Sequence, residues 1–370
     1  MSKIDQNLPP SPSSLLRPPL VFRCDSTPQI GTGHVMRCIA LGQAWQDAGG
    51  RAVFLMATEA PVLKSRLHSE GMEVVHLPVH PGSTDDAIQT ADFAHQVGAG
   101  WVVVDGYHFG ADYQRTIKDS GLRLLFIDDN GHAGHYSADL VLNQNIHAHE
   151  GLYPNREPYT RLLLGTRYVL LRREFLKWRG WKREIPEVAC KVLVTMGGSD
   201  PNNVTLKVIQ ALQQVDIDGL EAIVVVGGSN PHYGELQSAV QDSRFPIRLE
   251  SNVTNMPELM ACAEMAVIAA GGTVWELLFM GCPVVSYARN GLQHEILSKL
   301  NGTNAVSYQG YTSQMDETEL ALSVARMACS KAEREQKSLA GRLIVDGNGA
   351  KRVLNELISN AESNVIWTAT

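Results

Sequence analysis

The chain has 370 residues, of which 44% are hydrophobic and 19% are charged, and its formal net charge is -7. These values are typical of a folded globular protein rather than a disordered one, and the length suffices for two domains with separate cores. The acidic balance argues against broad nucleic-acid binding, which needs a basic face, but it is compatible with a local basic pocket for an anionic ligand. No run is long and apolar enough to span a bilayer, so we expect neither a nucleic-acid nor a membrane partner.

The six cysteines are scattered along the chain, and no two of them form a Cys-x-x-Cys pair. We therefore expect neither a disulfide framework nor a structural zinc site, and the pattern favours a reducing, cytoplasmic location. The first nineteen residues carry prolines, serines and little hydrophobicity. They predict a flexible tail over residues 1–19 rather than a secretory signal.

From about Leu20 onwards, short β-rich runs alternate with amphipathic stretches of helix length. Apolar positions recur at helical spacing from Val35 to Trp45, and the pair Gly49-Gly50 ends that helix. Further strands of this half are predicted at residues 52–56, 73–77, 101–105, 123–128 and 139–143. Strands separated by helices imply right-handed crossovers and a mostly parallel sheet.

The second half repeats the scheme, with strands predicted at residues 191–196, 222–226, 247–250, 265–269 and 283–287. A charged segment that contains Trp178 and Trp181, residues 172–187, separates the halves. We expect a first domain over residues 20–180, a second over residues 181–348, and a terminal helix and tail over residues 349–370, with the helix packing back on the body. The predicted fold is α/β, with two doubly wound, Rossmann-like domains facing each other across a cleft.

The most informative motif follows the first strand, which ends in the charged residues Arg23 and Asp25. A loop with Gly31 and Gly33 comes next, and His34 stands where a helix should begin. Ligands of such folds collect at the carboxyl ends of the strands, and the positive end of a helix dipole opposes protonation of an imidazole. A neutral His34 could therefore take a proton from water. The alternative is a tight turn with a capping histidine, but the neighbouring charges favour a site.

Neither a dinucleotide nor a metal is expected. The pattern G-x-G-x-x-G fails because position 36 is methionine, and no Gly-Lys-Ser/Thr sequence of a Walker motif occurs. His132-x-x-His135 follows Asp128-Asp129, but these ligands are too few and the helical His-Glu-x-x-His arrangement is missing. We therefore predict no cofactor and no metal ion.

Two glycine turns of the second half suit a phosphate, because glycines let the backbone approach a ligand and a helix start offers free amides. One is Gly197-Gly198-Ser199, which could also be a plain loop capped by Asp or Asn. The other is Gly271-Gly272-Thr273. Thr273-x-x-Glu276 matches a capping box, and from the residues alone we favour that interpretation, although a carboxylate could also bind a ribose diol.

Polar residues close several strands of the first half, among them Asp105, Tyr107, Asp128 and Asn143. They could line the cleft, or each could cap its own loop.

At these residues the chain resembles the UDP-sugar hydrolases of pseudaminic acid biosynthesis, which hydrolyse UDP-2,4-diacetamido-2,4,6-trideoxy-β-L-altropyranose to the sugar and UDP. The similarity runs from about Val21 to about Leu357. Four motifs carry it in order along the chain: Arg23-x-Asp25 with Ile30-Gly31-x-Gly33-His34-x-x-Arg37, Gly165-x-x-Tyr168-x-Leu170-Leu171-Arg172-x-x-Phe175, Met196-Gly197-Gly198, and Ala270-Gly271-Gly272-Thr273.

The resemblance implies the glycosyltransferase-B fold, related to the UDP-N-acetylglucosamine transferase that makes lipid II. His34 matches the catalytic histidine of the family. The residues then expected at the sugar are Arg23, Asp25, Gly31, Gly33, Tyr107 and Asn143. The residues expected at UDP are Gly197, Gly198, Ser199, Val253, Gly271, Gly272, Thr273, Glu276 and Gln293. Among them Glu276 would meet the ribose hydroxyls, and the loop at residues 252–256 would lie against uracil.

The reaction expected is inverting attack of water on the anomeric carbon, with His34 as the base and UDP as the leaving group. Backbone amides at Gly198 and Gly272 would stabilise the growing diphosphate charge. Asp25 would orient His34, while Arg23 or Tyr107 would position the sugar. Asp105-Gly106-Tyr107-His108 departs from the commonest form of the family at this strand end, which bears on the identity of the sugar.

Three alternatives stay open at this point: a UDP-sugar glycosyltransferase of the same fold, a hydrolysing 2-epimerase, and a non-catalytic protein that binds nucleotide sugars. A transferase that acts on lipid should expose a basic or apolar patch on the first domain. We see no clear one in the sequence, and water is therefore the favoured acceptor.

Overall fold

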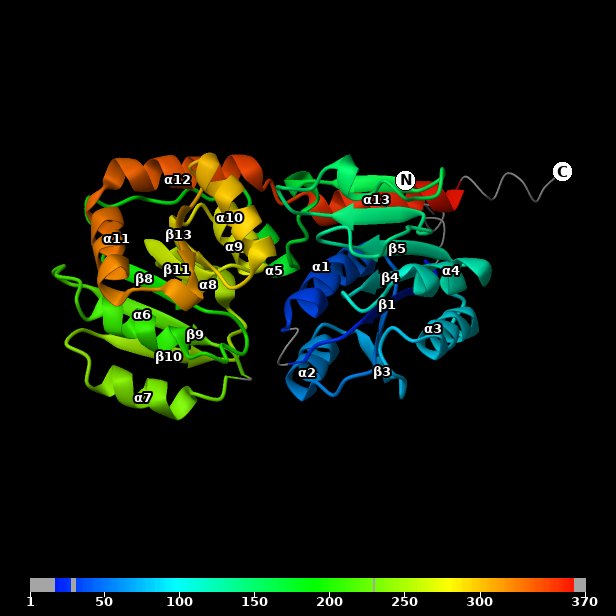
Figure 1. Cartoon of the computed structure of the whole chain (residues 1–370), viewed down its shortest axis with the longest axis horizontal. Coiled ribbons are helices and arrows are strands. Elements are labelled where there is room, and N and C mark those ends of the chain that lie inside the picture. The colour runs from blue at the N-terminus through cyan, green and yellow to red at the C-terminus, as the bar shows by residue number, and fades with distance from the viewer. Residues whose placement is uncertain (1–16, 28–30, 229, 363–370) are drawn as a thin grey trace, which may run out of the picture.

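The computed structural model describes residues 17–27, 31–228 and 230–362. Of the tail predicted over residues 1–19, all but the last three residues lie outside this range. Figure 1 shows two lobes side by side, each built on one sheet, and the two Rossmann-like domains confirm the predicted fold class. None of the helices in the described ranges combines the length and the apolar character that crossing a bilayer demands.

The sheet of the first domain has seven parallel strands in the order β3-β2-β1-β4-β5-β6-β7. Its strands are β1 (Leu20–Cys24), β2 (Ala52–Met56), β3 (Glu73–His76), β4 (Trp101–Asp105), β5 (Arg123–Ile127), β6 (Leu140–Asn143) and β7 (Arg161–Leu164). The helices are α1 (Gly33–Asp47), α2 (Pro61–Ser69), α3 (Thr84–Gln96) and α4 (Ala111–Asp119), with short 3-10 turns η1 (Glu150–Leu152) and η2 (Thr166–Tyr168).

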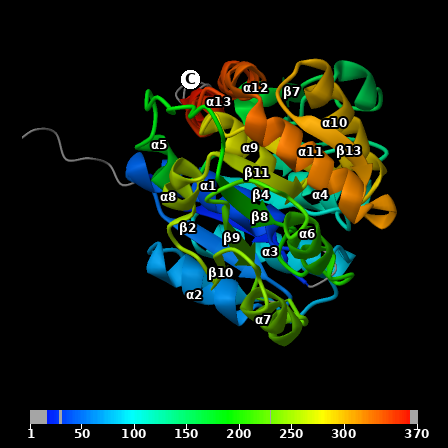
Figure 2. The same ribbon diagram turned by 90° about the vertical axis from the view of Figure 1, so that its left-hand side faces the viewer.

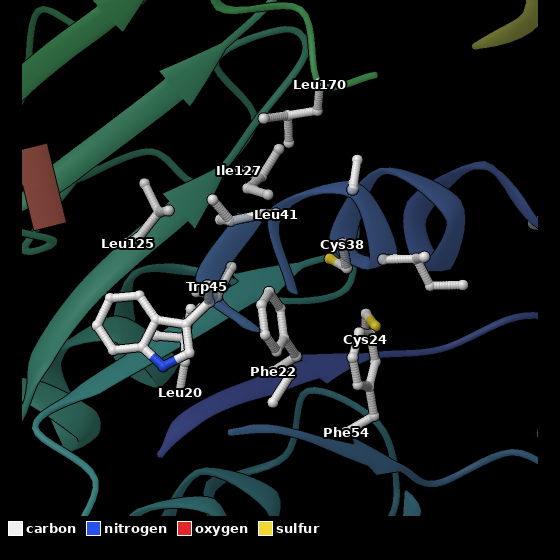
Figure 3. Packing of buried hydrophobic residues seen from close by; sticks show 14 of the residues in the cluster. Leu20, Phe22, Cys24, Cys38, Leu41, Trp45, Phe54, Leu125, Ile127 and Leu170 are labelled. Atoms are coloured by element: carbon white, nitrogen blue, oxygen red, sulfur yellow. The ribbon is translucent and has the colours of Figure 1, made fainter. Parts of the chain in front are cut away.

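The core of this domain is built from strands that are buried on both faces, as the continuous apolar runs predict for a parallel sheet. Every residue of β1 is buried. Phe22 of β1 lies opposite Phe54 of β2, and their rings stack with centroids 4.6 Å apart. Figure 3 shows these rings beneath Trp45 and Leu41 of α1, so the apolar face of α1 covers this side of the sheet and fixes where the helix begins.

The sheet of the second domain has six parallel strands in the order β10-β9-β8-β11-β12-β13. Its strands are β8 (Lys191–Thr195), β9 (Glu221–Val226), β10 (Ile247–Ser251), β11 (Met265–Ala269), β12 (Val284–Ala288) and β13 (Ser307–Tyr311). The helices are α6 (Val204–Leu212), α7 (Tyr233–Gln241), α8 (Met256–Cys262), α9 (Thr273–Phe279), α10 (Gly291–Gly302), α11 (Glu317–Cys329) and α12 (Lys331–Ile344), and η3 (Thr312–Gln314) is a 3-10 turn. In Figure 2 this domain faces the viewer, and α6 and α11 lie side by side over its sheet.

The order of strands reverses once in each sheet, and this reversal positions the site. In the first sheet the chain moves outward from β1 to β3 and then returns to place β4 on the other side of β1. In the second sheet β8 has the position equivalent to that of β1: the chain moves outward from β8 to β10 and then returns to place β11 on the other side of β8. Ligands of doubly wound folds bind at such switch points, at the carboxyl ends of the strands. The loops after β1, β4, β8 and β11 are therefore the expected walls of a site.

The domains are joined through a short segment whose successive side chains pack into different cores. Leu170 belongs to the core of the first domain, while Val169 and Leu171 belong to that of the second. The segment continues into α5 (Arg173–Leu176). The last helix, α13 (Gly349–Glu362), crosses back and lies along α1, and its buried side chains Val353 and Leu357 join the core of the first domain (Figure 1).

Candidate active site

His34 and Asp105 form a hydrogen-bonded pair at the switch point of the first sheet. His34 is the second residue of α1, and Asp105 is the last residue of β4, the strand beside β1. His34 Nδ1 lies 2.6 Å from Asp105 Oδ1. Arg37 Nη2 also lies 3.1 Å from this nitrogen, but the contact with Asp105 is shorter. Because a carboxylate only accepts, we assign the proton to Nδ1, and the lone pair of the neutral ring is then on Nε2. Among the described residues, Nε2 has no hydrogen-bond partner.

Arg37 also contacts Asp105. It lies three residues after His34 and therefore on the same face of α1, because residues three apart share a helix face. Its Nε donates to Asp105 Oδ2 at 2.6 Å, and its Nη1 donates to Asp129 Oδ1 at 2.7 Å. Burial alone raises the pKa of the Asp105 carboxyl, but the charge of Arg37 and the contact with His34 outweigh it, so the pKa lies well below its usual range. The same opposition of burial and Arg37 lowers the pKa of Asp129. Both carboxylates are therefore ionised at neutral pH.

Tyr107 lies beside His34. Its ring meets the imidazole edge-on with centroids 5.0 Å apart, and its hydroxyl donates to Asp129 Oδ2 at 2.8 Å. Burial and the charge of Asp129 raise the pKa of this phenol far above its usual range, so the hydroxyl stays protonated. With 49% of its surface exposed, Tyr107 is accessible to a ligand.

The structure corrects the expectations for Arg23 and Asp25. Arg23 has no exposed surface, and its Nε and Nη2 donate to the two carboxylate oxygens of Asp86, each at 2.8 Å. Asp25 accepts from Arg23 Nη1 at 2.5 Å and from the amide of Ala57 at 2.8 Å. This buried ion-pair cluster stabilises the loop that follows β1. Arg23 is not available to a sugar, and Asp105 rather than Asp25 orients His34.

The expectation that Asn143 contacts the sugar is also corrected, because Asn143 is fully buried at the end of β6. Its Nδ2 donates to the backbone oxygen of Asp129 at 3.0 Å, and its Oδ1 accepts from the amide of Asn145 at 3.0 Å. Asn145 in turn donates to Asp129 Oδ1 at 2.7 Å. Asn143 thus supports the loop that carries Asp129 and is not placed to contact a substrate.

Gly31 lies in the loop before His34, and Gly33 directly precedes this histidine. Gly31 has a φ of +79°, a conformation that favours glycine, and its carbonyl accepts from the hydroxyl of Ser26 at 2.9 Å. Gly33 opens α1. A Cβ added to either glycine would meet no described atom within 4 Å, so the space above this loop is open. Residues 28–30 of the loop lie outside the described residues.

The first glycine turn of the second domain faces the histidine loop across the domain boundary. Gly197 and Gly198 follow β8, and a Cβ built on Gly198 would lie 3.7 Å from the side chain of Thr32, the residue before α1. Gly197 has a φ of +98°, and Ser199, which follows Gly198, is buried. The Gly31–His34 motif of the first domain and the Gly197-Gly198 turn of the second domain are therefore close together.

The second glycine turn, after β11, is open and differs from the expected capping box. Gly271 and Gly272 are exposed, and a Cβ on either would meet no described atom within 4 Å. Because α9 already begins at Thr273, its N-cap is Gly272, and no side chain caps the helix. The capping-box interpretation of Thr273 and Glu276, favoured from the residues alone, is therefore wrong.

Glu276 is instead held by Arg172, whose Nη2 donates to Glu276 Oε1 at 2.8 Å. Arg172 is part of the motif that runs from Gly165 to Phe175, so this motif connects the segment between the domains to α9. Burial raises the pKa of the Glu276 carboxyl, and the charge of Arg172 opposes that shift without cancelling it. The hydrogen bond from Arg172 thus fixes the orientation of the Glu276 carboxylate in the first turn of α9, directly after the Gly271-Gly272 turn.

The remaining predicted nucleotide residues lie on neighbouring loops. Val253 follows β10 and Asn252, whose φ is +52°. Gln293 lies in the first turn of α10, where its Oε1 accepts from the amide of Arg289 at 2.8 Å. Of the four described non-glycine residues with positive φ, Asp200 and Asn203 lie in the loop after β8, and Asn252 lies in the loop after β10. Such strain persists where the surroundings impose it and often accompanies function.

His132 and His135 take separate partners rather than sharing one ion. His132 Nδ1 lies 3.2 Å from Asp128 Oδ1, while His135 Nε2 lies 3.0 Å from Glu157 Oε1. Over the ranges that the structure describes, no three His, Cys, Asp or Glu side chains gather as metal ligands would.

Comparison with solved structures defines the class of fold. MurG of Acinetobacter baumannii matches with a TM-score of 0.63 and 16% identity, over 92% of this chain and 100% of that chain. HepE of Anabaena, solved with UDP and glucose, matches with a TM-score of 0.59 and 15% identity, over 92% and 99% of the two chains. The chain has the glycosyltransferase-B fold.

Comparison with curated sequences then confirms the predicted resemblance: this chain is a distant homologue of the UDP-2,4-diacetamido-2,4,6-trideoxy-beta-L-altropyranose hydrolase of Campylobacter jejuni. The two are 24% identical over 275 residues, which cover 73% of this chain and 92% of the hydrolase. The spore coat polysaccharide biosynthesis protein SpsG of Bacillus subtilis is 26% identical over 62% of this chain and 67% of that protein.

An uncharacterized protein of Methanocaldococcus jannaschii is 26% identical over 308 residues, or 80% of this chain. The match spans 62% of that protein, less than two thirds of its length. No family model matches the chain.

Proposed function

We propose that this protein hydrolyses a UDP-linked, N-acylated deoxyamino sugar to the free sugar and UDP. The substrate class we infer is a UDP-2,4-diacetamido-2,4,6-trideoxy sugar, and the step belongs to pseudaminic acid biosynthesis. The observation that carries the proposal is the His34–Asp105 pair, which lies beside a loop that faces the Gly197-Gly198 turn of the other domain. The named relatives, a UDP-sugar hydrolase and a polysaccharide biosynthesis protein, support nucleotide-sugar chemistry.

UDP is assigned to the second domain. The diphosphate would lie along the open turns after β8 and β11, two strands that are neighbours at the switch point. Glu276, held by Arg172, would accept from the ribose hydroxyls, and Val253 and Gln293 would border the nucleotide. The residues assigned to the diphosphate are Gly197, Gly198, Ser199, Gly271, Gly272 and Thr273.

The first domain is assigned the sugar and the attacking water. His34 Nε2 takes a proton from water as its oxygen attacks the anomeric carbon, and the bond from that carbon to the UDP oxygen breaks on the opposite face. The configuration is therefore inverted. The resulting imidazolium is stabilised by the ionised Asp105, which Arg37 keeps in place. A positioned general base typically contributes about 10²–10⁴-fold to the rate.

Incubation with a panel of UDP-diamino-trideoxy sugars, followed by proton NMR, tests this assignment. We expect UDP and free sugar in equal amounts, with the first-formed anomer opposite in configuration to the substrate. If UDP is released only when an alcohol acceptor is added, the protein is a glycosyltransferase and the proposed hydrolysis is wrong. Binding of UDP-sugars with no turnover even at stoichiometric enzyme would make it a binding protein.

A further inference from the structure

Arg289 lies at the carboxyl end of β12, the strand next to the edge strand β13 of the second sheet. Its backbone is held firmly by the start of α10. The amide of Arg289 donates to Gln293 Oε1 at 2.8 Å, and Asn290 Oδ1 accepts from the amide of Gln293 at 3.0 Å. The side chain therefore leaves the sheet from a fixed point.

The guanidinium of Arg289 lies against Gly197 in the turn that faces the first domain. A Cβ built on Gly197 would lie 3.1 Å from Nη1, 3.5 Å from Cζ and 3.6 Å from Nη2. Because these three atoms are nearly equidistant from that point, the flat side of the guanidinium faces the glycine. The missing side chain at Gly197 thus leaves room for a cation beside the turn.

Arg289 also differs from Arg37 and Arg172 in having no anionic partner among the described residues. Arg37 and Arg172 each bind two carboxylates. Within the described ranges, the guanidinium of Arg289 has no hydrogen bond and no ion pair. Asp200 is the acid that acts on it electrostatically, but its oxygens already accept from the amides of Val204 and Thr205 at 2.9 Å and 2.8 Å.

The side chain of Arg289 is exposed, so its guanidinium is accessible to an anion. Removal of water lowers the pKa of Arg289, and the Asp200 charge opposes that shift only in part. An arginine nevertheless stays protonated under all ordinary conditions. The guanidinium is therefore a charged and accessible group whose donors can bind an anion.

We infer that Arg289 binds the diphosphate of the nucleotide, with its forked donors on two phosphate oxygens, and stabilises the charge that grows as the leaving group departs. The assignment of the anion rests on the proposed function, whereas the position and the missing partner of Arg289 do not. Planar guanidinium groups match phosphate oxygens in pairs, which a lysine does not reproduce. The Gly197-Gly198 turn meets Thr32 of the first domain, so this contact lies at the junction between leaving group and base.

The test is calorimetric titration of the intact chain and of Arg289→Gln with UDP, UMP and uridine. A hydrogen bond to a charged group contributes enough that we expect UDP to bind about 10- to 100-fold more weakly to the variant. Uridine, which has no phosphate, should bind both proteins within about threefold on the same reasoning. Arg289→Lys should recover only part of the UDP affinity.

Lys299→Gln is the matched control, because Lys299 is an exposed cation on the same helix, α10. It should leave all three affinities unchanged. If the unaltered chain binds UDP but Arg289→Gln binds it equally well, the role of Arg289 is wrong while the proposed function stands. If the unaltered chain binds no UDP, both are wrong. A loss of uridine affinity equal to the loss of UDP affinity would mean that Arg289 only supports the fold of the loops.

Discussion

At the scale of single residues, the chemistry depends on which nitrogen of His34 carries the proton. Asp105 decides this, since its oxygen lies 2.6 Å from Nδ1 and accepts but cannot donate. Arg37 keeps that carboxylate ionised and in place. In the proposed mechanism the base therefore depends on Asp105 and Arg37, which act through His34 and are positioning residues.

Substitution of these residues should reduce turnover without reducing nucleotide affinity. In Asp105→Asn the amide can donate to Nδ1, which shifts the proton to Nε2 and removes the base, so kcat should fall about 10²–10⁴-fold. His34→Gln should nearly abolish turnover for the same reason. Steady-state kinetics and UDP titration measure the two effects. The UDP dissociation constant should stay within about threefold, because neither residue contacts the nucleotide.

His95→Gln is the matched control, since His95 is an exposed histidine on α3, outside the site. It should leave kcat unchanged. Near-normal turnover in His34→Gln would remove His34 from the role of base, and normal turnover in Asp105→Asn would show that the pair has no part in orienting the ring.

At the scale of elements, the contact between Arg172 and Glu276 links the domain connection to α9. The carboxylate would otherwise be free to rotate, because α9 begins without a side-chain cap. The ion pair is largely buried, with side-chain exposures of 10% and 15%, so removing one partner leaves the other charge poorly compensated.

Glu276→Ala should weaken UDP binding about tenfold or more, since the ribose hydroxyls lose a charged acceptor. Uridine affinity should fall in parallel, unlike in Arg289→Gln, because the ribose is common to both ligands. Titration with the two ligands measures this. A Thr273→Ala variant, which tests the capping box directly, should keep the thermal stability of the chain. An unchanged UDP dissociation constant in Glu276→Ala would contradict the role of Glu276.

The same elements show how far the sequence predicts the structure. Apolar, β-branched runs identified the strands of both sheets except β7 and β13. β7 has only four residues and begins with Arg161, while β13 contains Gly310 and polar side chains, so neither has the pattern of a buried strand. The motifs located the glycine turns and His34, because turns of this kind depend on local residue types.

The side-chain partners could be predicted less well. Position at a strand end does not reveal which way a side chain points, and Arg23 and Asn143 proved to be buried. The pairing of His34 with Asp105 requires β4 to lie beside β1, which depends on strand order and not on local sequence. Arg37 had a usable signal, since its spacing of three from His34 puts both on one face of α1.

At the scale of the whole molecule, the two domains are connected at two points that touch each other. The chain crosses at Val169 and returns at Gly349, and a Cβ on Gly349 would lie only 2.1 Å from the carbonyl oxygen of Val169. The segment also anchors both domains, because Leu170 packs into the core of the first domain while Val169 and Leu171 pack into that of the second. This anchoring restricts the orientation of the domains relative to each other. This arrangement keeps the His34 loop opposite the Gly197-Gly198 turn, as the proposed mechanism requires of the base and the leaving group.

Hydrolysis in water labelled with ¹⁸O tests the central claim most directly, because it reports which bond breaks. With a UDP-2,4-diacetamido-2,4,6-trideoxy sugar as substrate, mass spectrometry should find the label in the hydroxyl group at C1 of the released sugar and none in UDP. That result would mean attack of water on the anomeric carbon, where His34 is expected to act. Label in UDP instead would mean attack at phosphorus, and it would contradict the account.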